Sequence, residues 1–296
     1  MFHILIAILR SIILIVNLLV LPTVVVVLGL IRLLPVPPLK RLLTYIIYEI
    51  IVPVWLSINT FAVLYGNKAT LNLSQKGELD KNGWYFVISN HVSWADILIL
   101  TGIFNRKIPM IKFFMKKELL WSLPIVGVAA WLVDFPVMQR HSKEYLKKHP
   151  EQRGKDIETT RKKCEIFKHQ PVSIINFLEG TRFTEAKKRQ RNSAFHHLLP
   201  PKAGGLAFTL AALKEVMHDI IDVTLCYQPN GQSLWDLLCN RVDRIDVHIE
   251  VIPIPSTLRG DYYNDREFKI GFNQWLHDRW LLKDAIIEAM LKDQKA

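Results

Sequence analysis

The stretch WYFVISNHVSWAD, residues 84–96, is the part of the sequence that best indicates the fold class of this chain. Its first six residues, Trp84–Ser89, are an almost unbroken apolar and aromatic run, which predicts a buried strand. The chain then turns at Asn90 and His91, and Ser93–Thr101 predicts the beginning of a helix. A strand, a polar turn and a helix in succession are typical of α/β domains, whose active sites lie at the carboxyl ends of strands.

Short apolar runs alternate with longer polar stretches along the chain after Tyr65. This alternation predicts an α/β domain over residues 67–296, with a mixed, largely parallel sheet flanked by helices. Its strands are predicted at Trp84–Ser89, Pro109–Phe114, Ala130–Phe135, Val172–Leu178, Asp222–Tyr227 and Ile245–Ile254, and its other helices at Lys155–His169, Lys202–His218 and Phe272–Met290.

Two apolar stretches precede this domain. Ser11–Ile31 contains no charged residue, and Leu42–Leu64 contains only Glu49. Each is long enough to cross the hydrocarbon core of a membrane as a helix, and the proline-rich connector between them predicts a turn. The first run is longer than the apolar part of a signal peptide, and no cleavage pattern follows it. We therefore predict a membrane-embedded helical hairpin over residues 1–66.

The charges around this hairpin leave its topology open. Its connector carries Arg32, Lys40 and Arg41, and the following domain is also basic. Because positive residues prefer the cytoplasmic side, two full crossings would place one basic set on the wrong side. Either the first helix alone spans the bilayer or both helices enter one leaflet. In both cases we expect the domain to face the cytoplasm, at the inner membrane of a bacterium.

The composition favours lipid over nucleic acid as a partner. The chain is 50% hydrophobic, with a formal net charge of +11 and a mean hydropathy of +0.16. A basic chain with such an apolar N-terminus suits anionic lipid surfaces and phosphorylated substrates, and no nucleic-acid-binding motif is evident. The three cysteines and the adjacent His196 and His197 lack the spacing of a disulfide framework or a metal site, so no metal is expected.

His91 and Asp96 are the first candidates for catalysis. If His91 lies in the turn and Asp96 in the first turn of the helix, the carboxylate can bind one imidazole nitrogen and leave the other free as a general base. The alternative is structural, because Ser93 and Asp96 match a helix-capping pattern. The spacing alone leaves both interpretations open. A lipid hydrolase would need an activated nucleophile, and no GxSxG motif is present.

Two further segments carry side chains suited to a phosphate. FLEGTRF, residues 177–183, follows a predicted strand, and its Gly180 permits close backbone approach to a ligand. Thr181 and Arg182 add a hydroxyl and a fork of N–H donors, although a turn with a surface arginine is the simpler interpretation. Arg140 ends the segment FPVMQR, residues 135–140, and surface arginine is again the simpler alternative.

Taken together and in this order, these segments resemble the glycerolipid acyltransferase family typified by 1-acylglycerol-3-phosphate acyltransferase. The NHxSxxD block of that family is matched by residues 90–96, and its EGTR block by residues 179–182. Residues 135–140 resemble the second block without its early glycine, and residues 223–227 occupy the place of the fourth block without its proline. Residues 179–206 further resemble the branch that contains lysocardiolipin and lysophosphatidylinositol acyltransferases.

The resemblance implies an O-acyltransferase that needs no cofactor or metal. The donor would be acyl-CoA or acyl-carrier protein, and the acceptor a lysophospholipid, first of all 1-acylglycerol-3-phosphate. The basic run Lys187–Arg191 is open to two interpretations, a solvated surface or a contact with anionic headgroups. The implied catalytic residues are His91 and Asp96, and the implied substrate-binding residues are Asn90, Ser93, Arg140, Glu179, Gly180, Thr181, Arg182 and Lys202.

Overall fold

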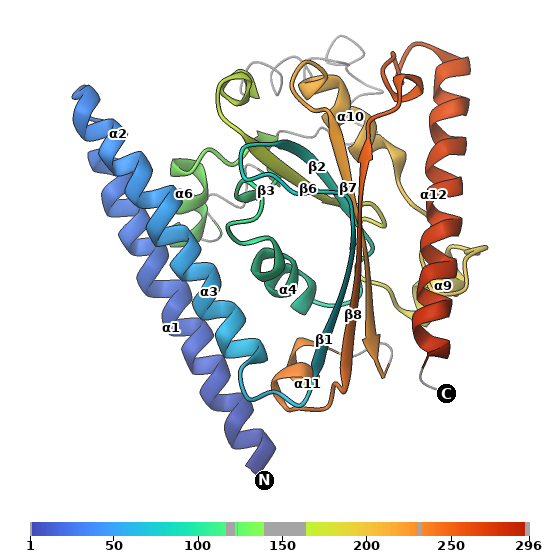
Figure 1. The fold of residues 1–296 in the computed structure, drawn as a ribbon, viewed down its shortest axis with the longest axis horizontal. Helices are drawn as coiled ribbons and strands as arrows, with labels where there is room; N and C mark the ends of the chain where they lie inside the picture. The colour runs from blue at the N-terminus through green and yellow to red at the C-terminus, as the bar shows by residue number, and fades with distance from the viewer. Residues whose placement is uncertain (1, 117–121, 123, 139–163, 230–232, 294–296) are drawn as a thin grey trace.

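The computed structural model of the chain describes residues 2–116, 122, 124–138, 164–229 and 233–293. Its main strands are β1 (Thr70–Lys76), β2 (Trp84–Ser89), β3 (Ile111–Phe113), β6 (Val172–Phe177), β7 (Asp219–Gln228) and β8 (Arg244–Pro253). They form one sheet in the order β1-β8-β7-β2-β6-β3 (Figure 1), parallel throughout except for the antiparallel pair β7 and β8. The predicted mixed, largely parallel sheet is therefore confirmed.

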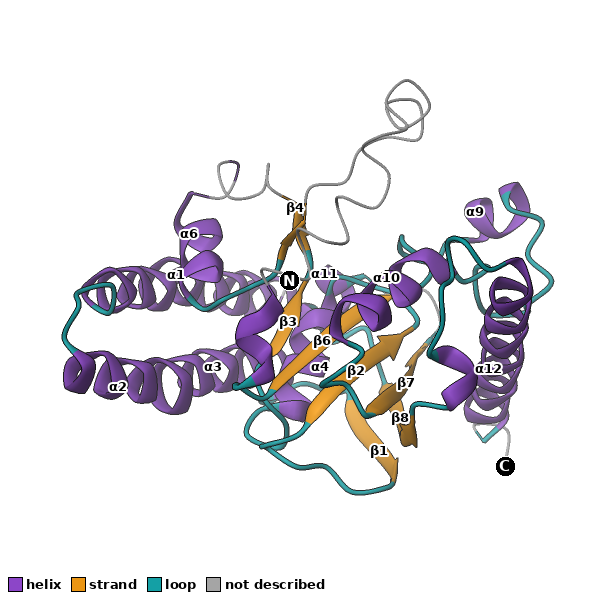
Figure 2. Cartoon of the chain, turned by 90° about the horizontal axis from the view of Figure 1, so that it is seen from above, coloured by secondary structure: helices purple, strands orange, loops and turns teal. Residues whose placement is uncertain are grey.

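Strand β2 lies inside this sheet and is buried on both faces, as its apolar sequence predicts. Phe86 and Ile88 share a hydrophobic cluster with helices α10 (Ala203–Leu213) and α12 (Arg266–Lys292). Tyr85 and Val87 belong to the cluster that includes helix α4 (Ala95–Phe104). The N-terminal helices therefore lie on one side of the sheet and α12 on the other (Figures 1 and 2).

The N-terminal helices form an antiparallel pair. Helix α1 (Phe2–Ile31) is followed by α2 (Pro37–Tyr45), the π-helical segment η1 (Ile46–Ile51) and α3 (Val52–Leu64), which continue one another without a break. Both Phe2–Ile31 and Pro37–Leu64 are long and apolar enough to cross a membrane. The predicted hairpin is present, and Pro37 begins its second helix, where a missing N–H costs nothing.

Helix α1 of this hairpin contacts the α/β domain near both of its ends. Near the start of α1, the buried Arg10 donates to the carbonyl of Leu238 at 2.8 Å and to Oδ1 of Asn240 at 2.7 Å. Near its end, Gly29 faces Leu132 so closely that a Cβ would lie 2.9 Å from the leucine Cβ. Both ends of α1 are therefore held against the domain.

The remaining described elements are short. They are the parallel pair β4 (Met115–Lys116) and β5 (Val137–Met138), helices α6 (Pro124–Leu132), α9 (Glu185–Gln190) and α11 (Leu234–Leu238), and the 3-10 turns η3 (Cys164–Lys168) and η4 (Ser256–Leu258).

Two sequence predictions need correction. The strand predicted at Ala130–Phe135 is wrong, because residues up to Leu132 belong to helix α6, which packs against α1. The edge strand β1 was not predicted, because all its residues are exposed and its apolar alternation is limited to Leu71 and Leu73. Most of the helix predicted at Lys155–His169 lies outside the described residues, and its end forms η3.

Candidate active site

His91 and Asp96 meet at the carboxyl end of β2. Helix α4 begins only at Ala95, so His91 lies in the turn before it, and its Nδ1 is 2.7 Å from Oδ2 of Asp96. The Asp96 side chain is completely buried and that of His91 is 13% exposed. Because the carboxylate accepts, Nδ1 carries the proton and Nε2 keeps a free lone pair. The structure thus brings the predicted pair together in the geometry of a general base.

Asp96 also closes the turn, so the capping interpretation is partly right as well. Its Oδ2 accepts from the backbone N–H of Val92 at 2.7 Å and of Ser93 at 3.0 Å. Ser93 itself is buried, and its hydroxyl accepts from the N–H of Ala95 at 3.3 Å. One carboxylate therefore both shapes the loop and orients the imidazole.

Two aromatic residues that the sequence analysis missed complete this arrangement. The Tyr227 hydroxyl donates to Oδ1 of Asp96 at 2.8 Å, and burial raises the pKa of this tyrosine well above its usual value. Tyr227 therefore stays a proton donor to the carboxylate. On the other side, the Phe177 ring stacks on the His91 imidazole with 4.1 Å between ring centroids and 15° between planes. The histidine ring is thus fixed by one hydrogen bond and one stacking partner.

Glu179 ties the histidine turn to the following loop. Its Oε1 accepts from the backbone N–H of His91 at 2.9 Å, and its Oε2 from that of Leu199 at 3.0 Å. The carbonyl of His91 accepts from the N–H of Phe183 at 2.7 Å. The loop of residues 178–183 is consequently hydrogen-bonded to both the backbone N–H and the backbone carbonyl of His91.

Asn90, Ser93 and Glu179, which the family resemblance assigns to substrate binding, lie inside the protein. All three are buried, and their polar atoms bind within the protein. The Asn90 amide, for example, exchanges two hydrogen bonds of 2.8 Å with the backbone of Leu225. Because buried polar groups need partners, these residues hold the loops around His91.

The C-terminal helix supports the same loops from behind. Trp280 Nε1 donates to the carbonyl of Leu199 at 3.0 Å, and the Asp284 carboxylate accepts from the N–H groups of His196 and His197, both at 2.7 Å. Leu199 is the residue whose N–H reaches Glu179. Helix α12 therefore helps to position the His91 turn, and no motif in the sequence indicated this.

The exposed side of the loop carries the cations. Gly180 has φ +66°, and a Cβ there would lie 3.1 Å from Nζ of Lys202, so glycine allows both the turn and the close lysine. Arg182 lies over the Trp94 ring, 4.8 Å from its centroid. Burial and the positive charge of Arg191 lower the pKa of Lys202.

The basic run after this loop has a role that neither interpretation proposed. Lys187 donates to the Thr181 hydroxyl at 2.8 Å and to the carbonyl of Arg182 at 2.9 Å. Arg191 donates to the carbonyl of Glu179 at 3.0 Å. These cations hold the loop through its oxygen atoms, and within the described parts of the chain none of them, nor Arg182 or Lys202, pairs with a carboxylate. The loop therefore presents uncompensated positive charge.

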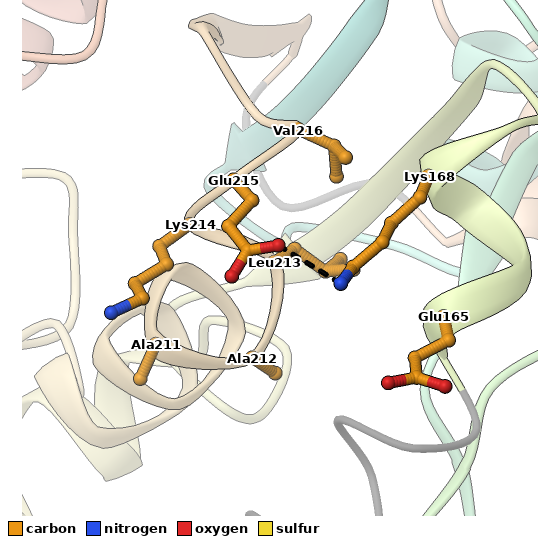
Figure 3. Close-up of a pocket in the computed structure, with 8 residues that line it drawn as sticks. All are labelled: Glu165, Lys168, Ala211, Ala212, Leu213, Lys214, Glu215 and Val216. Atoms are coloured by element: carbon orange, nitrogen blue, oxygen red, sulfur yellow. Dashed lines mark ion pairs between the residues drawn. The ribbon is translucent and has the colours of Figure 1, made fainter.

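Arg140, predicted to hold the acceptor, is outside the described residues. The pocket in Figure 3 lies between η3 and the end of α10, with an ion pair of 2.9 Å between Lys168 and Glu215. It contains none of the predicted site residues.

The free energy of unfolding should depend on pH through Glu179. Burial raises the pKa of this carboxyl to about 7, against the opposing effect of its backbone hydrogen bonds. The folded protein keeps this proton after the unfolded chain has lost it, so Glu179 stabilises the fold fully below its ordinary pKa of about 4.3. This contribution is lost as the pH rises to about 7.

Thermal unfolding of the detergent-solubilised chain at graded pH tests this expectation. Relative to Glu179→Gln, which cannot titrate, the wild type should lose stability between about pH 4.5 and 7. The exposed Glu165→Gln is the matched control and should follow the wild-type curve. Parallel curves for wild type and Glu179→Gln would disprove the raised pKa.

Comparisons with known proteins agree with the geometry. The family model "Acyltransferase" matches residues 70–228. An uncharacterised acyltransferase of Schizosaccharomyces pombe is 25% identical over 245 residues, which cover 72% of this chain and 64% of that one. The 1-acyl-sn-glycerol-3-phosphate acyltransferase delta of Rattus norvegicus is 30% identical over 217 residues, covering 68% and 52%. The chain thus spans between about half and two thirds of the length of these relatives.

A solved structure shares the whole fold. The 1-acyl-sn-glycerophosphate acyltransferase PlsC of Thermotoga maritima superposes with a TM-score of 0.56 at 15% identity, over 97% of this chain and 96% of that one. At this identity the likeness concerns the fold alone, including its N-terminal helices. Because the family model spans more than half of the 296 residues, the chain belongs to the Acyltransferase family.

Proposed function

We propose that this protein transfers a fatty acyl group from a thioester donor, acyl-CoA or acyl-carrier protein, to the free hydroxyl of a lysophospholipid. The observation that carries the proposal is the position of the His91–Asp96 pair beside a loop of uncompensated cations. A general base next to an anion-binding surface suits an alcohol that also bears a phosphate. Membership of the family supports acyl transfer as the reaction.

The chemistry follows from the orientation of His91. Its Nε2 takes the proton of the acceptor hydroxyl while the oxygen attacks the thioester carbonyl carbon. The C–S bond then breaks, an ester remains, and the sulfur leaves with the proton that His91 had taken. Asp96, held by Tyr227, stabilises the imidazolium between these two steps.

The first acceptor we propose is 1-acylglycerol-3-phosphate, which would give phosphatidic acid. Its phosphate would bind to Arg182 and Lys202, both exposed beside the turn. The name of the Rattus norvegicus relative supports this choice. The alternative acceptors are lysocardiolipin and lysophosphatidylinositol, which the resemblance of residues 179–206 favours.

The hairpin would bring the enzyme to its lipid substrate. Arg10 and Gly29, near opposite ends of α1, both contact the α/β domain. Because both ends of α1 touch the same domain, we propose that the hairpin enters one leaflet. The domain would lie at the cytoplasmic surface, as the basic residues predict.

A lipid hydrolase is the competing class. It would need a nucleophile near His91, and Ser93, two residues further along the chain, is buried and accepts from the N–H of Ala95. Incubation of the protein with a lysophospholipid and a thioester donor separates the two classes. Diacyl product supports acyl transfer, whereas free fatty acid alone would exclude it.

Arg182→Gln should raise the KM for the acceptor roughly 10- to 100-fold, because a charge-assisted phosphate contact is lost. The measurement is the initial rate of diacyl product over a panel of lysophospholipids with a fixed donor. Arg189→Gln, an exposed change of equal charge on α9, is the control and should leave this KM near the wild-type value. An unchanged KM for Arg182→Gln would remove Arg182 from the phosphate role.

A further inference from the structure

Trp94 is an exposed aromatic residue between the two members of the candidate catalytic pair. It lies three residues after His91 and two before Asp96, at the N-cap position of α4, and it caps no backbone N–H with its side chain. The residue is 56% exposed, more than any other tryptophan in the described chain. Neither the helix cap nor the hydrophobic core therefore explains a tryptophan at this position.

The contact that the structure does give Trp94 is with Arg182. The guanidinium carbon of Arg182 lies over the indole ring, 4.8 Å from its centroid. The neighbouring cations are held differently: Lys187 and Arg191 donate to loop oxygens, and Lys202 packs against Gly180. Within the described residues, Arg182 forms neither an ion pair nor a side-chain hydrogen bond, so the indole is what holds its head group.

A ring face holds a guanidinium without using its hydrogen-bond donors. The attraction is electrostatic, between the positive charge and the negative face of the indole. All five N–H groups of Arg182 therefore remain available to a phosphate, which an arginine can bind through two parallel bonds. A side chain that is already held also loses less rotamer freedom when the ligand binds.

We infer that Trp94 is a positioning residue for Arg182, and that it sets the place of the acceptor phosphate relative to the His91 base. The inference rests on the proposed role of Arg182 in binding the acceptor. Trp94 lies on the same short segment as His91 and Asp96, whereas Arg182 comes from the loop after β6. Because Trp94 and His91 belong to one short segment, the indole keeps Arg182, and with it the acceptor phosphate, at a set distance from the base.

Steady-state kinetics of the full chain in phospholipid vesicles tests this inference. We expect Trp94→Leu to raise the KM for 1-acylglycerol-3-phosphate roughly 2- to 5-fold, with kcat within about twofold of wild type. Trp94→Phe keeps a ring and should restore most of the affinity. Trp235→Leu removes another exposed indole, 43% exposed on α11, and should leave KM unchanged.

A double variant separates action through Arg182 from an independent action of Trp94. In the Arg182→Gln background, Trp94→Leu should cause no further rise in KM, because the cation that it positions is gone. An undiminished rise in that background, or no rise in the wild-type background, would overturn the inference. Failure of the proposed function has a different signature, since the wild-type chain would then form no diacyl product. A mistaken phosphate role for Arg182 would instead leave the KM of Arg182→Gln unchanged.

Discussion

Replacing His91 with alanine should lower kcat for acyl transfer by about 10²- to 10⁴-fold, the range expected when a general base is lost. The reason is geometric: the Nδ1 of His91 is bound to Asp96 at 2.7 Å, which leaves its Nε2 to accept the hydroxyl proton. Acceptor binding should change little, because the cations lie on a separate loop. The measurement is diacyl product formed at saturating donor and acceptor.

Fold and membrane binding must be checked in the same variant, because the imidazole also stacks on Phe177. The His91→Ala chain should unfold at a temperature close to that of the wild type and sediment with vesicles as the wild type does. His218→Ala removes an exposed imidazole far along the chain and should retain full activity. A folded His91→Ala protein with undiminished transfer would refute the proposed mechanism.

Asp96→Asn should cause a loss of similar size in kcat, together with a loss of stability that His91→Ala does not show. The amide cannot stabilise an imidazolium, and it can favour the wrong tautomer of the histidine. Oδ2 of Asp96 accepts from His91, Val92 and Ser93, and Oδ1 accepts from Tyr227, so the single oxygen of an asparagine cannot serve all four donors. An unsatisfied buried donor costs about 1–3 kcal/mol.

Two further variants separate these effects. Tyr227→Phe removes only the hydroxyl that reaches Oδ1 of Asp96, and should lower kcat roughly fivefold, as the loss of one ordinary hydrogen bond predicts. Asp278→Asn makes the same charge change at an exposed position of α12 and should alter neither activity nor unfolding temperature. If Asp96→Asn keeps wild-type kcat, Asp96 does not orient the base.

The local sequence predicted the elements that an apolar run, bounded by polar residues, is enough to define. Strands β2 and β6 were placed within one residue of their observed ends, because an apolar run bounded by polar residues indicates a buried strand. The hairpin helices were predicted from their length and lack of charge. The run Ala130–Phe135 failed because short apolar segments suit a strand and a buried helix equally, and packing against α1 selects the helix.

In the candidate site, too, some features were predicted from the sequence and others became visible only in the structure. The spacing of His91 and Asp96 allowed either a helix cap or a catalytic pair, and in the structure one carboxylate accepts both from the backbone of the turn and from the imidazole. Ser93 and Glu179, predicted to bind the substrate, are buried and hydrogen-bonded inside the protein. A motif identifies which residue types occur together, whereas only the tertiary structure shows which of them are buried and what they bind.

The sequence by itself determined the α/β class, the apolar hairpin and the segment in which His91 and Asp96 lie close along the chain. Only the tertiary structure revealed the partners that make this pair rigid. Tyr227 lies 131 residues from Asp96, and Glu179 lies 88 residues from His91. Such contacts leave no periodic pattern in the sequence, because they arise only when β2, β6 and β7 pair and bring their carboxyl ends to one edge of the sheet.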